Sequence, residues 1–191
     1  MSTLDNPSTT EAADLPIRSN AVRTGLITGL LLVALSLVFQ VTGFSDPANA
    51  STSAGWITGL ISFVILAGGL IWGMNQHKQE QNGYLTFGQG LKIALLAALI
   101  VGVITAVWTV VNFTLVQPDM AATMEEAAKE QMYKQNPNLS DSDIEQAMGF
   151  MGLFFNPWFL AVASIFGTLL QGLIIGLIGS AILKNNPPET A

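Results

Sequence analysis

Four long stretches of the chain consist of apolar and neutral residues, without any ionisable side chain. They cover residues 24–44, 55–74, 93–113 and 158–183, and each is 20 to 26 residues long. A helix rises about 1.5 Å per residue, so about 20 residues cross the hydrocarbon core of a bilayer, which is about 30 Å thick. The pattern therefore predicts four transmembrane helices.

The composition agrees with this interpretation. Hydrophobic residues make up 50% of the chain and charged residues 10%, whereas about 25% of the residues in a soluble domain are charged. We therefore predict an all-α fold: a polytopic membrane protein with four transmembrane helices and an amphipathic helical outer loop.

Polar segments divide the chain into a transmembrane domain and two tails. Residues 1–20 are rich in Ser, Thr, Asp, Asn and Pro, which predicts a disordered cytoplasmic tail. Residues 21–185 form the four-helix transmembrane domain, and residues 186–191 form a second cytoplasmic tail. Within the domain we expect helices at about 24–44, 55–74, 91–113 and 158–183, with an outer loop at 114–157.

The outer loop carries two helical patterns of its own. Glu125 with Lys129 and Glu130 with Lys134 are spaced i, i+4, which favours a first helix. A second helix is predicted to begin after Ser140, its N-cap. The apolar residues that share one face of the second helix are Ile144, Ala147, Met148 and Met151. We expect two amphipathic helices that lie over the outer face.

The distribution of basic residues gives the expected orientation. Five of the seven Lys and Arg residues fall on one side of the four helices, which by the positive-inside rule is the cytoplasmic side. These five are Arg18, Arg23, Lys78, Lys92 and Lys184, whereas Lys129 and Lys134 fall on the other side. We therefore expect a multi-pass protein of the inner (cytoplasmic) membrane with both termini in the cytoplasm.

The first apolar stretch has a second interpretation. A basic segment, an apolar run and the small-residue sequence Ala48-Asn49-Ala50 resemble a secretory signal peptide with its cleavage site. The run is longer than the roughly 7 to 15 residues of a signal-peptide core. We favour a transmembrane helix, and cleavage after Ala50 stays open as the alternative.

Pairs of glycines four residues apart recur in three of the four stretches. Such a pair lies on one face of a helix and lets another backbone approach closely. The pairs are Gly25 with Gly29, Gly55 with Gly59, Gly69 with Gly73, and Gly172 with Gly176. They predict helix packing, either within the chain or against a second copy or another membrane protein.

The polar residues inside the four stretches are neutral. They include Gln40, Thr105, Thr109, Asn112, Ser164, Thr168 and Gln171. Proton relays and coupled transporters use ionisable intramembrane groups, so this pattern argues against a proton-coupled pump. Gln171 lies near the middle of the fourth stretch and needs a hydrogen-bond partner there. We expect an interhelical hydrogen bond, with contact to a solute as the alternative.

The chain has few residues suited to catalysis or metal binding. It has no cysteine and one histidine, His77, which we expect in the exposed connection between the second and third helices. These counts disfavour metal sites and catalytic triads, so we predict that the protein is not an enzyme and has no cofactor. A net charge of −6 makes nucleic acid an unsuitable partner.

Two metal sites are weaker alternatives, both in the outer loop. Asp141, Asp143 and Glu145 lack the glycine and the distal glutamate of a calcium loop. Five of the seven methionines also lie in this loop, and thioethers suit Cu(I). Methionine is equally a common packing residue on an amphipathic face, and we predict no metal.

The connection before the third helix contains a helix-start motif. Thr86 and Gln89 have the spacing of a capping box, in which each side chain accepts a hydrogen bond from the other residue's backbone amide. Phe87 is then expected at the membrane interface, with Lys92 extending to the headgroups. This predicts that the third helix begins before the bilayer.

Three segments in this order resemble a bacterial membrane family known as domain of unknown function 4199. They are residues 83–92, Gln117-Pro118-Asp119 and residues 172–184, and the resemblance covers about residues 20–185. It implies a four-helix envelope membrane protein and carries no assigned activity. The motif positions, whose role is unknown, are Gly83, Thr86, Phe87, Gln89, Lys92, Pro118 and Asp119.

These observations lead to two hypotheses for function. The first is a non-enzymatic integral membrane protein that lies in the lipid bilayer and binds another membrane protein or itself. The alternative is an oligomeric carrier or channel for a small neutral or lipid-like solute, which would pass along the neutral polar residues.

The orientation can be tested with single cysteines introduced at Ser2, Ser142 and Thr190. An impermeant maleimide applied to intact spheroplasts should label the cysteine at position 142 and spare those at positions 2 and 190. Labelling at either terminus without labelling at position 142 would contradict the expected topology.

Overall fold

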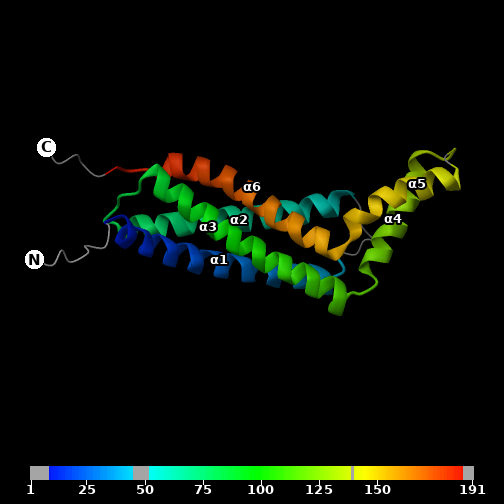
Figure 1. Ribbon diagram of the computed structural model, residues 1–191, viewed down its shortest axis with the longest axis horizontal. Helices are drawn as coiled ribbons and strands as arrows, with labels where there is room; N and C mark the ends of the chain where they lie inside the picture. The colour runs from blue at the N-terminus through cyan, green and yellow to red at the C-terminus, as the bar shows by residue number, and fades with distance from the viewer. Residues whose placement is uncertain (1–8, 45–51, 139, 187–191) are drawn as a thin grey trace, which may run out of the picture.

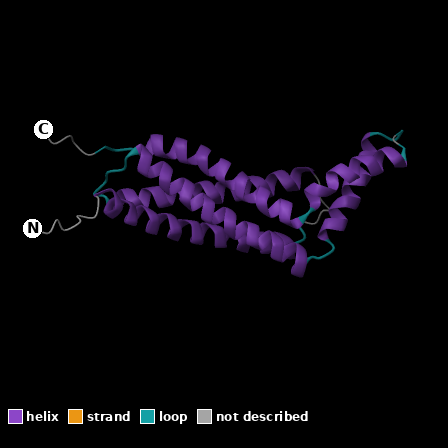
Figure 2. Ribbon diagram, in the orientation of Figure 1, coloured by secondary structure: helices purple, strands orange, loops and turns teal. Residues whose placement is uncertain are grey.

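Four long helices lie side by side in the computed structural model, which describes residues 9–44, 52–138 and 140–186. They are α1 (Thr9–Val41), α2 (Thr52–Glu80), α3 (Phe87–Val111) and α6 (Pro157–Leu183) (Figure 1). All four are long and apolar enough to cross a membrane. Figure 2 shows helices joined by loops, with no strand among the described residues. The chain is thus an all-α polytopic membrane protein, as the sequence predicts.

The bundle has two distinct ends, the termini end and the loop end. At the termini end, α1 begins, α6 ends and the turn between α2 and α3 is found; the loop end carries the segment between α3 and α6 (Figure 1). At the loop end α3 continues into a π-helix, Asn112–Val116. The expected cleavage point after Ala50 lies outside the described residues, as do 1–8 and 187–191 of the expected tails.

Helix α3 forms the centre of the bundle, with its most extensive contacts to α6 and then to α1. Its inner face consists of small side chains, and Ala94, Ala97, Ala98 and Val101 are fully buried. Lipid chains are as apolar as the helices, so helix association in a membrane depends on close van der Waals packing. The small side chains of α3 allow that packing on two sides.

Glycines of α6 and α1 lie directly against α3. A Cβ atom on Gly176 would be 2.8 Å from the Cβ of Ala94, and one on Gly172 would overlap Ala98. On the other side of α3, a Cβ on Gly25 would be 2.7 Å from the Cβ of Ile100. Real Cβ atoms do not approach this closely, so these positions hold glycine for contact within the chain.

Glycines of α2 lie in the same way against α1. A Cβ on Gly73 would meet the side chain of Thr24, and one on Gly69 would be 3.0 Å from the Cβ of Thr28. Three of the four glycine pairs therefore face other helices of this chain, since Gly29 likewise lies against α3. Gly55 and Gly59 differ, because no described residue lies within 4 Å of a Cβ at either position.

Both helices at the termini end extend further than the sequence indicated. The disordered tail expected at residues 1–20 is wrong for residues 9–20, because α1 begins at Thr9 and Ile17, Asn20 and Ala21 are buried. Helix α2 continues to Glu80 instead of ending at residue 74. Only the part of a helix that lies in hydrocarbon needs to lack charged residues. Both extensions contain charged residues, so the uncharged stretches did not include them.

Helix α3 begins at Phe87, four residues before the expected start, behind the predicted capping box. The backbone amide of Gln89 donates to the hydroxyl of Thr86 over 3.3 Å, and the amide of Thr86 donates to Oε1 of Gln89 over 3.0 Å. Phe87 and Lys92 are exposed, as expected for residues at the interface.

The outer loop folds into α4 (Met120–Gln135), α5 (Asp141–Met151) and a 3₁₀ turn, Gly152–Phe155. The predicted pairs Lys129–Glu125 and Lys134–Glu130 form over 2.8 and 2.7 Å. Asp119 occupies the N-cap of α4 and follows Pro118, but its side chain makes no capping bond. The two helices are therefore confirmed.

The position of these helices differs from the expectation that they lie over the outer face. Helices α4 and α5 pack on each other and on the 3₁₀ turn and extend away from the loop end of the bundle (Figure 1). Ile144 and Met148 are buried within this hairpin. The apolar face predicted for α5 thus packs inside the hairpin.

The start of α5 has the predicted N-cap. The hydroxyl of Ser140 accepts a hydrogen bond from the backbone amide of Asp143, and the Asp143 carboxylate accepts from the amide and the hydroxyl of Ser140. These hydrogen bonds hold the pKa of the Asp143 carboxyl below its usual value. They stabilise the helix while the carboxyl is ionised.

Adjacent glycines of α2 offer a matched test of helix packing. Gly69→Ala should lower the free energy of unfolding by about 1 to 3 kcal/mol, because the new methyl overlaps Thr28. Gly68→Ala faces open space and should be neutral or stabilising by up to about 1 kcal/mol through helix propensity. Thermal unfolding in detergent measures both, and Thr28→Ala should restore part of the loss. Equal effects of the two substitutions would contradict the close approach of α1 and α2.

Candidate functional site

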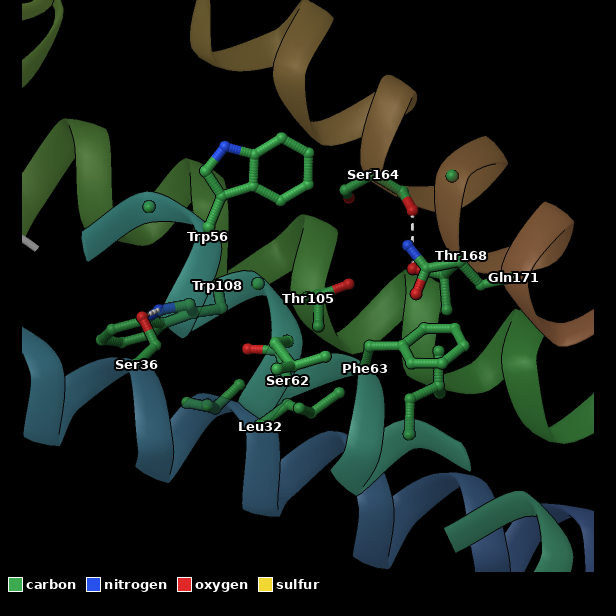
Figure 3. Close-up of a pocket in the computed structure, with 16 residues that line it drawn as sticks. Leu32, Ser36, Trp56, Ser62, Phe63, Thr105, Trp108, Ser164, Thr168 and Gln171 are labelled. Atoms are coloured by element: carbon green, nitrogen blue, oxygen red, sulfur yellow. Dashed lines mark hydrogen bonds between the residues drawn. The ribbon is translucent and has the colours of Figure 1, made fainter. Parts of the chain in front are cut away.

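A cavity of about 880 Å³ lies in the loop-end half of the bundle, between α2 and α6, with α1 and α3 behind it. Figure 3 shows side chains from all four helices around this space. Its lining residues are Leu32, Val33, Ser36, Gly55, Trp56, Gly59, Leu60, Ser62, Phe63, Leu66, Thr105, Trp108, Ser164, Gly167, Thr168 and Gln171. This is the place where the structure brings most of the neutral intramembrane polar residues together.

The cavity exists because small residues of α2 and α6 face each other without meeting. Gly55 and Gly59 on α2 and Gly167 on α6 line it, and at each of them no atom of another described helix lies within 4 Å of the position of a Cβ. Helices α2 and α6 also contact each other far less than α3 contacts α6. The same residue type that closes the termini-end half of the bundle therefore leaves space in the other half.

Three hydroxyls in the cavity wall are bonded to the carbonyls of their own helices. Thr105 donates to the carbonyls of Val101 and Gly102 over 3.0 Å each. Thr168 donates to the carbonyl of Ser164 over 2.7 Å, and Ser164 to that of Ala161 over 2.8 Å. Each of these oxygens has used its proton and keeps lone pairs that can accept a hydrogen bond.

The interhelical hydrogen bond expected for Gln171 does not form among the described residues. Its side chain is exposed in the isolated chain and lines the cavity (Figure 3). No hydrogen bond joins the amide of Gln171, or the hydroxyl of Ser62, to any other residue that the structure describes. The space between α2 and α6 explains this result, because no partner side chain from α2 reaches the amide.

Aromatic side chains form another part of the cavity wall. The indole Nε1 of Trp108 donates to the hydroxyl of Ser36 over 3.1 Å and so joins α3 to α1 behind the cavity. Trp56 lies near the start of α2 and is 78% exposed. Phe63 lies deeper along α2, beside Gln171 in the view of Figure 3. Nothing in the sequence pattern indicated that Ser36, Ser62 and these aromatic residues share one site.

The cavity is electrically neutral. No Asp, Glu, Lys, Arg or His lines it in the part of the chain that the structure describes. No group of three or more His, Cys, Asp or Glu side chains that could hold a metal ion occurs in the described part of the chain. The arrangement offers shape, apolar surface and neutral hydrogen-bonding groups.

The other neutral polar residues lie outside the cavity lining. Thr109 donates to the carbonyl of Thr105 over 2.8 Å. Asn112 is 6% exposed at the start of the π-helix, and Gln40 is half-buried near the end of α1. They do not continue the cavity as a polar path through the membrane.

A second polar cluster joins α1 to α2 at the termini end. His77, expected in an exposed loop, is fully buried, because α2 continues past it. The side-chain amide nitrogen of Asn20 lies 3.1 Å from Nδ1 of His77 and donates to the carboxylate of Glu80. Nε2 of His77 has no hydrogen-bond partner among the described residues. The histidine thus belongs to a helix contact.

These residues form one seam between α1 and α2. Asn20, Thr24 and Thr28 are spaced four apart on α1 and lie against residues spaced four apart on α2, which are His77, Gly73 and Gly69. The two glycines were predicted from the sequence as packing residues, whereas the three polar residues opposite were not. The i, i+4 spacing of the polar residues was the signal that could have revealed them.

The family-motif segment before α3 is hydrogen-bonded to the end of α6 at the termini end. Gly83 has a φ of +88°, which suits glycine. Its carbonyl accepts a hydrogen bond from the side chain of Asn185, and Leu85 exchanges two backbone hydrogen bonds of 2.9 Å with Asn185. The motif therefore ties the α2–α3 turn to the end of α6. The cavity at the other end contains none of these motif residues.

Comparison with known proteins gives a family and no activity. No curated protein and no solved structure matches the chain. Residues 23–185 match the family described as "Protein of unknown function (DUF4199)". This match covers all four long helices except the first residues of α1, and the chain belongs to the DUF4199 family.

Proposed function

We propose that this protein is a non-enzymatic membrane protein that binds a small, uncharged, lipid-like molecule in the cavity between α2 and α6. The observation that carries the proposal is the cavity itself, because it is apolar, uncharged and open to the side of the bundle. Of the two hypotheses from the sequence, this favours the carrier for a neutral solute over the protein-binding role.

The size and lining of the cavity support a ligand. Its volume of about 880 Å³ falls within the range of about 300 to 1,000 Å³ that is typical of small-molecule sites. Such sites are mainly apolar and have a few convergent polar groups. Gln171, Ser62 and Thr105 supply such groups here, on three different helices.

The exposure of the wall gives a route for the ligand. Trp56, Leu60 and Phe63 line the cavity and are 78%, 64% and 41% exposed in the isolated chain. In a bilayer these faces meet lipid, so a lipid-like molecule can enter sideways between α2 and α6. Toward the termini end, packing of Leu70, Ala97 and Val101 closes the bundle. A continuous channel through one chain is therefore not part of the proposal.

The membrane and orientation that we propose come from the charge distribution. The basic residues Arg18, Arg23, Lys78, Lys92 and Lys184 belong to the termini end, which favours cytoplasmic termini in a bacterial inner membrane. The cavity then lies in the outer leaflet.

Self-association or binding of another membrane protein is the second candidate. It is supported by Gly55 and Gly59, a glycine pair that faces no partner helix among the described residues. A helix from a second copy would pack against this face of α2 and cover the cavity. Three glycine pairs packed within the chain leave this one for such contact.

Photolabelling with a photoactivatable long-chain alcohol tests the ligand-binding proposal. With the full chain in lipid nanodiscs, labelling should concentrate on residues 55–66 and 164–171. Gly59→Leu and Gly167→Leu fill the cavity and should reduce labelling of these residues at least about fivefold. In free energy this loss equals that of about one or two hydrogen bonds. Gly68→Leu, on the open face of α2, serves as the control and should not change the labelling. Labelling spread evenly over the lipid-facing surfaces would contradict the proposal.

Cysteine cross-linking tests the second candidate. If two copies meet at α2, a single cysteine at Gly59 gives disulfide-linked dimers in native membranes, whereas a cysteine at Gly68 gives few. Equal cross-linking at the two positions, or none at either, would argue against a dimer on this face.

A further inference from the structure

We infer that the ligand of the cavity carries an uncharged group that both donates and accepts hydrogen bonds, such as a hydroxyl or an amide, and that Gln171 binds this group deep in the membrane. The inference rests on the proposed function and specifies the chemistry of the ligand.

The first argument is the position of Gln171 along α6. It lies fourteen residues after Pro157, the first residue of the helix, and therefore about 20 Å along the helix axis. Half the thickness of a hydrocarbon core is about 15 Å. The amide thus lies near the middle of the bilayer, out of reach of the headgroups of ordinary phospholipids.

The second argument is that the amide has no partner. No described residue bonds to the side chain of Gln171, and an amide without a hydrogen bond is costly in hydrocarbon. An exposed position on α6 does not require glutamine, because leucine or isoleucine would suit lipid better. An amide at this position gains stability when a ligand supplies its hydrogen bonds.

The third argument concerns which hydrogen-bonding groups remain unused. Thr105 and Thr168 have donated their protons to backbone carbonyls, so they can only accept from a ligand. Gln171 and Ser62 have free donors, and no described residue occupies them. Free donors and free acceptors face the same space (Figure 3). A hydroxyl or an amide satisfies both kinds, whereas an ether or ester oxygen satisfies only the donors.

The fourth argument is the absence of charge in the lining. Among the residues that the structure describes, no cationic side chain lines the cavity to pair with a phosphate, sulfate or carboxylate, and no acidic one lines it to pair with an amine. Burying an unpaired charge in this environment is strongly unfavourable. The ligand group next to Gln171 is therefore neutral.

Competition among matched probes tests the inference. The full chain in nanodiscs is labelled with a photoactivatable long-chain alcohol, and four competitors of equal chain length are compared: the alcohol, its methyl ether, the alkane and the alkyl sulfate. The alcohol should compete about three- to tenfold better than the ether or the alkane, as expected for one or two additional hydrogen bonds. The alkyl sulfate should compete worst.

Gln171→Leu identifies the residue responsible. It should remove the preference for the alcohol over the alkane while labelling of the cavity continues. Gln40→Leu, a glutamine outside the cavity lining, is the matched control and should keep the preference. Ser62→Ala should reduce the preference by a smaller factor, and it provides a second test if Gln171→Leu fails to fold.

The outcomes separate this inference from the proposed function. If no probe labels the cavity, both are overturned. If the cavity is labelled but the alcohol, ether and alkane compete equally, the proposed function holds and the hydroxyl or amide ligand is overturned. Strongest competition by the alkyl sulfate, or an unchanged preference in Gln171→Leu, overturns the inference as well.

Discussion

Close contact between helix backbones at small residues is the interaction on which this structure depends. In lipid, an apolar side chain gains little by moving from acyl chains to a neighbouring helix, so helices associate through close van der Waals packing. Helix α3 provides the surface for this packing, with Ala94, Ala97 and Ala98 fully buried. Glycines of α1 and α6 meet that surface so closely that a Cβ atom would not fit. Adding a single methyl group at one of these glycines would therefore create an overlap with α3.

The cavity follows from the same packing rule. Gly69 and Gly73 of α2 rest on threonines of α1, which fixes α2 against α1 in the termini-end half of the bundle. Further along α2, a Cβ on Gly55 or Gly59 would meet no described residue within 4 Å, and the same holds for Gly167 on α6. Helix α2 thus pairs with α1 over part of its length and is separated from α6 over the rest. The space results where two small-residue faces lie too far apart to touch.

The sequence predicted the transmembrane segments because charge is excluded from hydrocarbon whatever the packing. It also predicted local hydrogen bonds that depend on spacing alone, such as the capping box of Thr86 and Gln89. It did not predict the burial of His77, since the partner Asn20 is 57 residues away and on a segment that looked disordered. It failed for Gln171 for a related reason: whether an amide finds a partner depends on the distance between two helices.

The contrast between hydroxyl and amide side chains explains why one polar residue dominates the site. Serine and threonine in a helix can donate to the carbonyl three or four residues earlier, as Thr105, Ser164 and Thr168 do. The helix itself therefore satisfies them, and they say little about a partner. None of the cavity's hydrogen bonds satisfies the amide of Gln171 in this way. At the termini end, the side-chain amide of Asn20 finds its hydrogen-bond partners on another helix, in His77 and Glu80 of α2. Gln171 faces a space that no side chain of the described residues fills, and in the proposed function the bound molecule supplies its hydrogen bonds.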